Sequence, residues 1–475
     1  MKVLLLVPPE ENYMTASIHK SLDHKREHRP LLGILSVATF LQQSRPQHEV
    51  KFVDCRALEM DFDAMARIVA DFAPDVVGLT TLTFNFFDTL QTARRIKSLE
   101  SPPRVVLGGW HVSLYPHETL EQPSVDFVVH GEGERSFVEL IDAIDDGSPL
   151  GDILGIGFQE DDGAVVVTGS RKVDRELDDL PFPDFSLTQV DLYSHILGGA
   201  KITLPMESSR GCPFACTFCD IRRTQFRFRS PELIVDEMER WVEQGISSFF
   251  FVDDNVTVNK KRALKLFNTI ADRGLNVEFK VSSRIDGLSP ELMEAMVRAG
   301  VSRVSLGIES TKQKYLDYMQ KETTVPQIVD CLAQARAVGL PVFAFMMLGL
   351  PGQTKQEMLE EADFLKRHKV DYASFSVMTV YPKTELYRRA TEAGQLRDDP
   401  WPSFARDPRP NVQAPYMNTL YPPEELKKIQ LAVTRRFYFS PRNLIRRIRE
   451  VDSLTTFKTR AKVALRMLGR EDVRL

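Results

Sequence analysis

Short apolar runs alternate with amphipathic segments over the first 146 residues. The apolar runs are typical of buried strands, and the segments between them have the spacing of helices that present one apolar face. The predicted strands are Val3–Val7, Val50–Val53, Val76–Leu79, Val105–Leu107 and Asp126–Val129; the predicted helices are Leu32–Leu41, Met60–Phe72, Thr89–Leu99 and Phe137–Ile144. Repeated βα units with continuous apolar strands indicate a parallel sheet covered on both faces. Residues 1–146 are therefore expected to form a doubly wound, Rossmann-like α/β domain, whose ligands would sit at the carboxyl ends of its strands.

A second alternating series begins near residue 201. Its predicted strands are Ile202–Glu207, Phe249–Val252, Phe279–Ser282, Arg303–Gly307, Phe343–Leu348 and Ser374–Val380, with helices such as Pro231–Gln244 and Pro290–Ala299 between them. Six units over residues 201–390 fit a partial (β/α)6 barrel, because a full eight-unit barrel normally needs about 250 residues. Residues 147–200 are expected to be a connector with a small hairpin formed by Ile156–Phe158 and Val165–Val167.

Residues 391–475 are expected to be a helical, basic C-terminal region. From Arg435 onward there are twelve Lys or Arg and four Asp or Glu, a local charge of +8 on a chain with a net charge of −5. Apolar and basic residues interleave in the stretch Leu444–Arg449, as in interfacial helices. Such a helix more often packs against the rest of the protein, here the barrel; peripheral membrane contact and a lipid substrate are the second hypothesis.

The overall composition indicates a globular protein, with 43% hydrophobic and 27% charged residues. The acidic net charge gives no support for a nucleic-acid partner. No segment reaches the roughly 18 apolar residues of a spanning helix. The N-terminal run reads as a buried strand rather than a secretory signal, so a cytoplasmic protein is expected.

Three of the five cysteines lie within eight residues, in the sequence Cys212-Pro-Phe-Ala-Cys216-Thr-Phe-Cys219 directly after the first predicted barrel strand. Thiolates are the usual ligands of iron–sulfur clusters. Three thiolates on a four-iron cube leave one iron open for a chelating cofactor. A zinc site is the alternative, but structural zinc usually has four protein ligands, and the His nearest in sequence is His195. Cys331 lies in a helical pattern and is expected to be a core residue.

The spacing C-x3-C-x-aromatic-C at the mouth of a partial βα barrel resembles the radical S-adenosylmethionine superfamily. The resemblance implies a 4Fe–4S cluster held by Cys212, Cys216 and Cys219, with S-adenosylmethionine chelating the open iron through its amino and carboxylate groups. One electron from the cluster then cleaves the cofactor, and the 5′-deoxyadenosyl radical abstracts a hydrogen atom from the substrate.

The resemblance also assigns cofactor contacts at the ends of later strands. Phe218 would border the adenine, while Asp253 and Asp254 would meet the methionine amino group. Ser282 would reach the ribose, and Arg284 would bind the methionine carboxylate. Glu309 stands in a stretch, Gly307 to Ser310, that is a common cofactor-side signature of related enzymes, and Gly349 to Gly352 is typical of the adenine side.

Several passages of the first domain resemble the cobalamin-binding domain that is fused to many radical enzymes. They include Thr80-Thr81-Leu82, Gly108-Gly109-Trp110-His111 and Gly131-Glu132-Gly133-Glu134. The resemblance implies a cobalamin site that includes Thr80, Thr81, Gly108, Gly109, Gly131 and Gly133. A dinucleotide site is unsupported, because the third glycine of G-x-G-x-x-G is missing after Gly133.

One feature departs from the best-known cobalamin pattern. The loop after the first strand begins Pro8-Pro9-Glu10-Glu11 and lacks the Asp-x-His-x-x-Gly motif whose histidine ligates cobalt in methyltransferases of the methionine synthase type. The radical subfamily often lacks it too. His111 and His130 are candidate lower ligands; otherwise the cobalt's lower face is open, or the domain keeps the fold without the cofactor.

Together the two resemblances predict an enzyme, a cobalamin-dependent radical methyltransferase acting on an unactivated carbon of a small-molecule or lipid substrate. A reductant such as ferredoxin or flavodoxin would supply the electron. The alternatives are a radical oxidoreductase or cyclase without methyl transfer, and a non-catalytic metal-binding protein. A methylthiotransferase fits less well, because that class carries a second cysteine triad in its N-terminal domain, where this chain has only Cys55.

Overall fold

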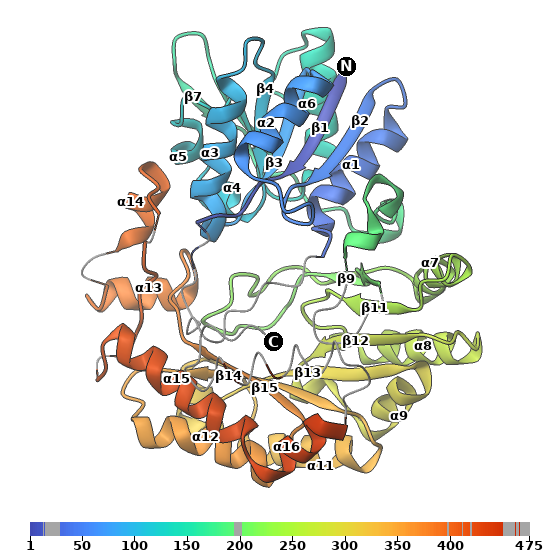
Figure 1. The fold of residues 1–475 in the computed structure, drawn as a ribbon, viewed down its shortest axis with the longest axis vertical. Coiled ribbons are helices and arrows are strands. Elements are labelled where there is room, and N and C mark those ends of the chain that lie inside the picture. Colours follow the sequence, from blue (N-terminus) through green and yellow to red (C-terminus); the bar gives the residue numbers. More distant parts are fainter. Residues whose placement is uncertain are drawn as a thin grey trace.

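The computed structural model describes residues 1–12, 14, 29–193, 202–396, 399–410, 412–418, 420–449, 461 and 465. A doubly wound sheet lies at one end of the molecule and a partial barrel at the other, and the short strand β9 lies between them (Figure 1). The α/β class and both architectures predicted from the hydrophobic pattern are confirmed.

The first sheet has the strand order β2-β1-β3-β4-β5-β6-β7, and its first five strands in chain order are parallel. They are β1 (Lys2–Val7), β2 (Glu49–Asp54), β3 (Val76–Thr80), β4 (Arg104–Gly108) and β5 (Phe127–Val129). Helices α1 (Leu32–Ser44) and α6 (Gly133–Asp146) pack together, as do α2 (Phe62–Phe72) and α3 (Phe86–Lys97). Successive β1 residues belong to different cores, Leu5 to one and Leu6 to the other, because side chains alternate along a strand.

The predicted hairpin is present as β6 (Ile156–Gln159) and β7 (Val165–Val167), which pair antiparallel. The hairpin also extends the first sheet, because β6 pairs antiparallel with β5. The sequence did not predict this pairing. Two short helices were also missed, α4 (Trp110–Leu114) and α5 (Pro116–Leu120), which follow β4.

The barrel sheet contains six parallel strands in the order β15-β14-β13-β12-β11-β8. They are β8 (Thr203–Met206), β11 (Ser248–Phe251), β12 (Glu278–Ser283), β13 (Val301–Glu309), β14 (Val342–Leu348) and β15 (Tyr372–Val377). The helices between them include α7 (Pro231–Glu243), α8 (Lys260–Asp272), α9 (Pro290–Ala299), α11 (Val325–Ala337) and α12 (Lys355–Arg367), and they lie on the outer side of the sheet (Figure 1).

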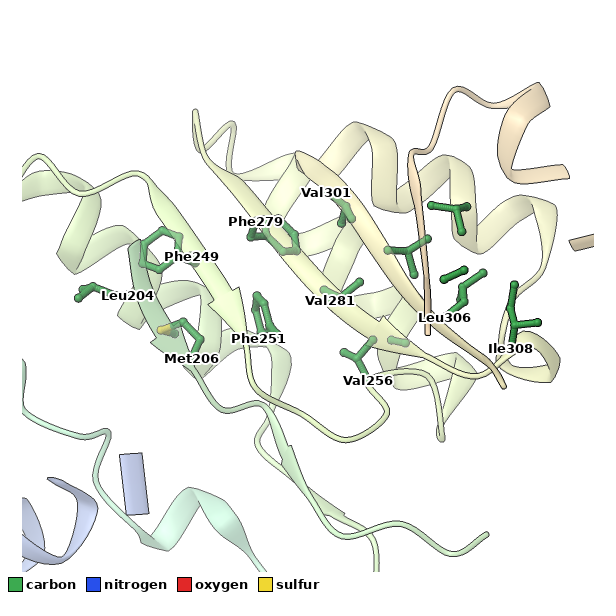
Figure 2. Packing of buried hydrophobic residues seen from close by; sticks show 14 of the residues in the cluster. Leu204, Met206, Phe249, Phe251, Val256, Phe279, Val281, Val301, Leu306 and Ile308 are labelled. Carbon is green, nitrogen blue, oxygen red and sulfur yellow. The ribbon is translucent and has the colours of Figure 1, made fainter. Parts of the chain in front are cut away.

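Alternate strand residues point to these helices and form the main core. Figure 2 shows Leu204 and Met206 of β8 beside Phe249 and Phe251 of β11, with Phe279 and Val281 of β12 next along the sheet. All six side chains are at most 2% exposed. The other residues of each strand face the concave side, where a barrel enzyme places its chemistry.

The chain returns to the first domain after the barrel. Helix α14 (Pro400–Arg406) packs against α5, and the Gln122 side-chain amide donates to the Arg406 carbonyl at 2.8 Å. Helix α13 (Glu385–Glu392) runs across the expected boundary at residue 390. Helix α15 (Pro423–Tyr438) packs on α12 and β15, and α16 (Pro441–Arg449) follows.

The basic region is partly held by the barrel. Arg436 pairs with Asp363 at 2.7 Å, and Arg446 pairs with Asp371. Leu444 and Ile445 of α16 remain 42% and 52% exposed. No helix in the described part of the chain is long and apolar enough to cross a membrane. Most of the predicted basic tail, from residue 450 on, lies outside the described residues.

Candidate active site

The three clustered cysteines lie on a loop between two short antiparallel strands, β9 (Ser209–Arg210) and β10 (Arg227–Phe228). Gly211 opens the loop with a φ of +84°, and a Cβ there would lie 2.3 Å from the Gln225 carbonyl oxygen. Only glycine fits this close approach. We call residues 209–228 the cysteine hairpin.

Local hydrogen bonds fix the start of the loop. The Cys212 N–H donates to the Thr224 hydroxyl at 2.8 Å, and the Thr224 N–H donates to the Cys212 carbonyl at 3.0 Å. Farther along, the Cys219 N–H donates to the Cys216 carbonyl at 3.3 Å. The loop is therefore ordered by its own backbone around all three cysteines.

The three thiols are differently exposed. Cys216 is buried, while Cys212 and Cys219 are half-buried. Burial raises the pKa of Cys219 to about 12 and also raises that of Cys212. Among the described residues, no three His, Cys, Asp or Glu side chains are arranged to hold a single metal ion. A cube whose irons each take one thiolate does not require the sulfurs to converge on one point.

Arg284 follows β12 and contacts the cysteine hairpin. Its guanidinium donates to the Cys216 sulfur at 3.3 Å and lies 3.9 Å from the centre of the Phe214 ring. It also forms two 3.0 Å bonds with Asp286 and donates to the Lys321 carbonyl. The arginine predicted to bind a carboxylate of the cofactor is therefore already engaged by Asp286 and by the loop.

Asp253 and Asp254 follow β11 and have different surroundings. The buried carboxylate of Asp253 accepts bonds from the Ser208 N–H at 3.0 Å, from the Ser208 hydroxyl at 2.6 Å and from the Ser209 hydroxyl. Asp253 thus holds the base of the cysteine hairpin. Asp254 is exposed, and its carboxylate has no side-chain partner within the described structure. Although part of its surface is open to solvent, the Asp254 carboxyl lies against protein and near other carboxylates; this partial desolvation and the Asp253 charge raise its pKa to about 6.

Glu309 lies at the end of β13 with a φ of +64°. Its carboxylate pairs with the Lys321 ammonium at 3.0 Å, and both side chains are more than 90% buried. The same ammonium lies 5.9 Å from the centre of the Phe218 ring. This places Glu309 and Phe218 around Lys321, a residue that the sequence analysis missed. Ser282 is half-buried on the neighbouring strand β12.

A cavity of about 550 Å³ opens at the carboxyl ends of the first sheet. It lies beside β1 and β3, the two strands between which the strand order reverses. Doubly wound sheets bind ligands at this switch point. Five of the six residues predicted for cobalamin line it: Thr80, Gly108, Gly109, Gly131 and Gly133. Thr81 does not; it is fully buried, and its hydroxyl bonds with Leu82 and Asn85.

Small residues keep this cavity open. A Cβ at Gly33 or Gly131 would meet no atom within 4 Å, and one at Gly108 would meet only the Val129 carbonyl oxygen at 3.6 Å. Larger residues there would fill the cavity rather than pack into the protein. A bulky ligand that enters deep between sheet and helix, as the tail of cobalamin does, fits such a cradle.

The two candidate cobalt ligands are placed elsewhere. His111 is fully buried, stacks on Phe86 with ring centres 3.8 Å apart and bonds to the Thr83 hydroxyl at 3.2 Å. Burial lowers the pKa of His111 to about 3, so the ring is neutral. His130 contacts the Thr168 carbonyl at 3.2 Å. Neither imidazole lines the cavity, so the structure gives no support to either as a ligand.

The barrel contributes one wall of the same cavity. Glu207, Arg210 and Thr224 line it together with the glycines of the first domain. Arg210 and Thr224 both belong to the cysteine hairpin, and Thr224 bonds directly to Cys212. The cavity and the cysteine loop therefore share side chains. The sequence analysis missed these three residues, because no periodicity links residues 33–134 with residues 207–224.

Comparisons with known proteins match the same two regions. The model of the Radical SAM superfamily matches residues 206–365, and the B12 binding domain model matches residues 28–141. An uncharacterized methyltransferase of Pyrococcus horikoshii is 32% identical over 456 residues, covering 95% of each chain. The chain belongs to the radical SAM enzymes that carry a B12-binding domain. In this chain the cysteine hairpin lies within the matched radical SAM region, and most residues that line the cavity lie within the matched B12-binding region.

Two further proteins resemble this radical SAM enzyme. The anaerobic magnesium-protoporphyrin IX monomethyl ester cyclase of Rubrivivax gelatinosus is 28% identical over 359 residues, 74% of this chain and 64% of the cyclase. The solved structure of OxsB, a cobalamin-dependent S-adenosylmethionine radical enzyme with aqua-cobalamin and S-adenosylmethionine bound, has a TM-score of 0.72. The alignment covers 98% of this chain and 71% of OxsB at 16% identity, so this likeness concerns the fold.

Proposed function

We propose that this protein is a cobalamin-dependent radical SAM methyltransferase that acts on an unactivated carbon. The observation that carries the proposal is the shared wall: Thr224 lines the cavity of the B12-binding domain and bonds to Cys212 of the hairpin at 2.8 Å. Two cofactor sites that share a side chain can act on one substrate bound between them. The relative from Pyrococcus horikoshii, 32% identical and named an uncharacterized methyltransferase, supports the same reaction class.

Some residues would hold the iron–sulfur cluster, and others would hold S-adenosylmethionine and cobalamin. Cys212, Cys216 and Cys219 would ligate three irons, and Asp254 is the carboxylate available for the methionine ammonium. The glycines of the cavity would hold cobalamin. When bound, these groups supply one-electron cleavage of S-adenosylmethionine and a transferable methyl group.

The protein's other part in the reaction is positioning. Asp253 holds the base of the hairpin, and Arg284 stacks on Phe214 and contacts Cys216. These contacts fix the cysteine loop at the carboxyl ends of the barrel strands, the end at which barrel enzymes place reacting groups. Fixed geometry matters because small displacements of reacting groups cost large factors in rate.

Analysis of the S-adenosylmethionine products tests the proposal. The enzyme would be purified anaerobically with cobalamin supplied, reconstituted with iron and sulfide, and reduced. Methyl transfer predicts S-adenosylhomocysteine together with 5′-deoxyadenosine. Formation of 5′-deoxyadenosine alone would contradict the proposal and favour the second candidate, a cyclase-type oxidation, which the 28% identity to the magnesium-protoporphyrin cyclase supports. Zinc without iron would contradict both.

The proposal requires a one-electron donor, and we propose a ferredoxin or flavodoxin. A reduced flavodoxin should support 5′-deoxyadenosine formation by the wild-type enzyme and not by a Cys216→Ala variant. If only a chemical reductant such as dithionite worked, and no ferredoxin or flavodoxin did, this part would be wrong.

We further propose that α16 contacts an anionic membrane surface, where a lipid substrate would be reached. Leu444 and Ile445 are exposed beside Arg442, which is also exposed. Exposed apolar residues flanked by arginines are typical of interfacial helices. Replacing both Leu444 and Ile445 by Glu should reduce sedimentation with phosphatidylglycerol vesicles. The control is Leu233→Glu on α7, where the leucine is 40% exposed. Equal sedimentation of the variant and wild type would contradict membrane contact.

A further inference from the structure

The two strands of the cysteine hairpin both form ion pairs with one short segment of the B12-binding domain, residues 131–134. Arg210 of β9 and Arg227 of β10 are direct cross-strand partners. Both guanidiniums donate to the Glu132 carboxylate. Arg210 does so at 3.2 Å, and Arg227 does so at 3.1 Å and through a second, shorter bond. Arg210 also donates to Glu134 at 2.8 Å. We call these four residues the arginine clamp.

The same motif lines the cavity. Gly131, Glu132, Gly133 and Glu134 all form part of the cavity wall, and Arg210 completes that wall from the barrel side. The resemblance to cobalamin-binding domains concerned the two glycines. The two glutamates between and after them face the cysteine hairpin, so one four-residue segment contacts both sites.

Burial makes the clamp more than a surface ion pair. The side chains of Arg227 and Glu134 are 4% and 6% exposed, that of Arg210 is 15% exposed, and that of Glu132 is 29% exposed. Burial alone would raise the pKa of Glu134, yet Arg210 and the Ser36 hydroxyl lower it below its ordinary value. Glu207, at the end of β8, bonds to the third donor of Arg210 at 2.9 Å. All three guanidinium nitrogens of Arg210 are bonded, whereas the buried Nε of Arg227 has no partner within the described structure. Removing one partner of a buried ion pair is costly.

The clamp acts at the hairpin itself. On another side of the domain junction, Lys383 bonds to the Leu114 carbonyl and Gln122 bonds to the Arg406 carbonyl. Those contacts join the domains without touching the hairpin. Loss of the clamp would therefore free the cysteine hairpin from the B12-binding domain, while Asp253 and Arg284 still hold it to the barrel and the domains stay joined.

We propose that Glu132 and Glu134 are positioning residues that set the iron–sulfur loop against the cobalamin cavity, and so couple radical formation to methyl transfer. The inference rests on the proposed methyltransferase function. Arg210 lies two residues before Cys212 and Arg227 three residues after Thr224, so a shift of either arginine moves the loop. A loop released from the clamp would still bind its cluster but would meet the other cofactor at a changed distance.

The test compares Glu132→Gln with wild type and with Glu139→Gln. Glu139 lies on α6, the helix that begins directly after Glu132, but it pairs with Arg171, away from the hairpin. We expect Glu132→Gln to keep its iron, sulfide and cobalamin content. The 5′-deoxyadenosine formed per methyl group transferred should rise on the order of tenfold or more. Glu139→Gln should match wild type.

A second variant covers the case in which Glu132→Gln fails to fold. The double variant Glu132→Gln with Arg227→Gln removes both charges and leaves no unpaired ion at this pair, so it should fold. It should show the same uncoupling. Wild-type product ratios in both variants, with cofactors bound, would overturn the clamp. Absence of S-adenosylhomocysteine from the wild-type enzyme would instead overturn the methyltransferase proposal, so the two failures are distinct.

Discussion

The hydroxyl of Thr224 accepts the backbone N–H of Cys212 at 2.8 Å, and the same threonine lines the cavity of the B12-binding domain. This contact places the first cysteine of the hairpin immediately behind the cavity wall. It also explains how a parallel-sheet domain and a partial barrel, each of a common type, form one site.

Thr224→Val should weaken the cysteine loop. The change removes an acceptor for the Cys212 N–H, and a hydrogen bond of this kind contributes about 1 kcal/mol. We expect lower iron incorporation when reconstitution is run with limiting iron, measured as iron and sulfide per chain. Thr224→Ser keeps the hydroxyl and should restore wild-type incorporation. Equal incorporation by the Val and Ser variants would show that the bond is dispensable.

Replacing any one of Cys212, Cys216 and Cys219 by Ala should abolish the cluster while cobalamin binding persists, because the cavity lies in the other domain. Iron analysis and the visible absorption spectrum measure the two cofactors separately. Cys331→Ala is the matched control, since Cys331 is buried in α11 as predicted. Retention of full iron by a triad variant would be inconsistent with these ligands.

Gly108→Leu should block the cavity. A side chain there has open space in front of it, so the protein should fold while cobalamin affinity falls at least tenfold, about 1.4 kcal/mol. Equilibrium dialysis with hydroxocobalamin gives the dissociation constant. Gly151→Leu is the control, because a Cβ at Gly151 meets no atom within 4 Å and the residue lies in an exposed turn outside the cavity. Unchanged affinity in the Gly108 variant would place cobalamin elsewhere.

Binding of S-adenosylmethionine should weaken as the pH falls through about 6. Burial and Asp253 raise the pKa of Asp254 to about 6, so its carboxylate is charged above that pH and neutral below it. Only the charged form attracts the methionine ammonium. Calorimetric titration of the cluster-loaded enzyme between about pH 5 and pH 8 should show this dependence, and Asp254→Asn should remove most of it.

The charge on Asp254 should favour binding of S-adenosylmethionine but should destabilise the folded protein. A raised carboxyl pKa means that the folded protein favours the proton, so the charged carboxylate destabilises the fold above pH 6 and this cost disappears at lower pH. Asp254→Asn should therefore raise the thermal midpoint at about pH 8 and leave it unchanged at about pH 4. A pH-independent difference would indicate another cause.

The sequence predicts most of the fold because buried parallel strands are continuous apolar runs. Every predicted strand is present, with ends shifted by up to three residues; β15, for example, is Tyr372–Val377 where Ser374–Val380 was predicted. The return of α14 to the first domain was not predicted. It depends on packing between segments nearly 300 residues apart, such as Gln122 and Arg406, which leaves no local pattern.

Candidate site residues that directly follow a strand could be predicted from the sequence. The hydrogen bonds and ion pairs between their side chains and distant segments could not. Asp253 and Asp254 are adjacent in sequence, yet only the structure shows that Ser208 and Ser209 engage one and leave the other free. The arginine clamp joins residues 76 to 95 positions apart. The sequence analysis predicted none of these pairings.

We propose that the cysteine hairpin and the cavity form one two-cofactor site. Electron paramagnetic resonance of the reduced enzyme, loaded with both cofactors so that the cluster and the cobalt are paramagnetic, tests it directly. We predict magnetic coupling between the two centres, visible as splitting or enhanced relaxation that disappears when either cofactor is omitted. Two independent, uncoupled spectra from a chain that holds both cofactors would contradict the account.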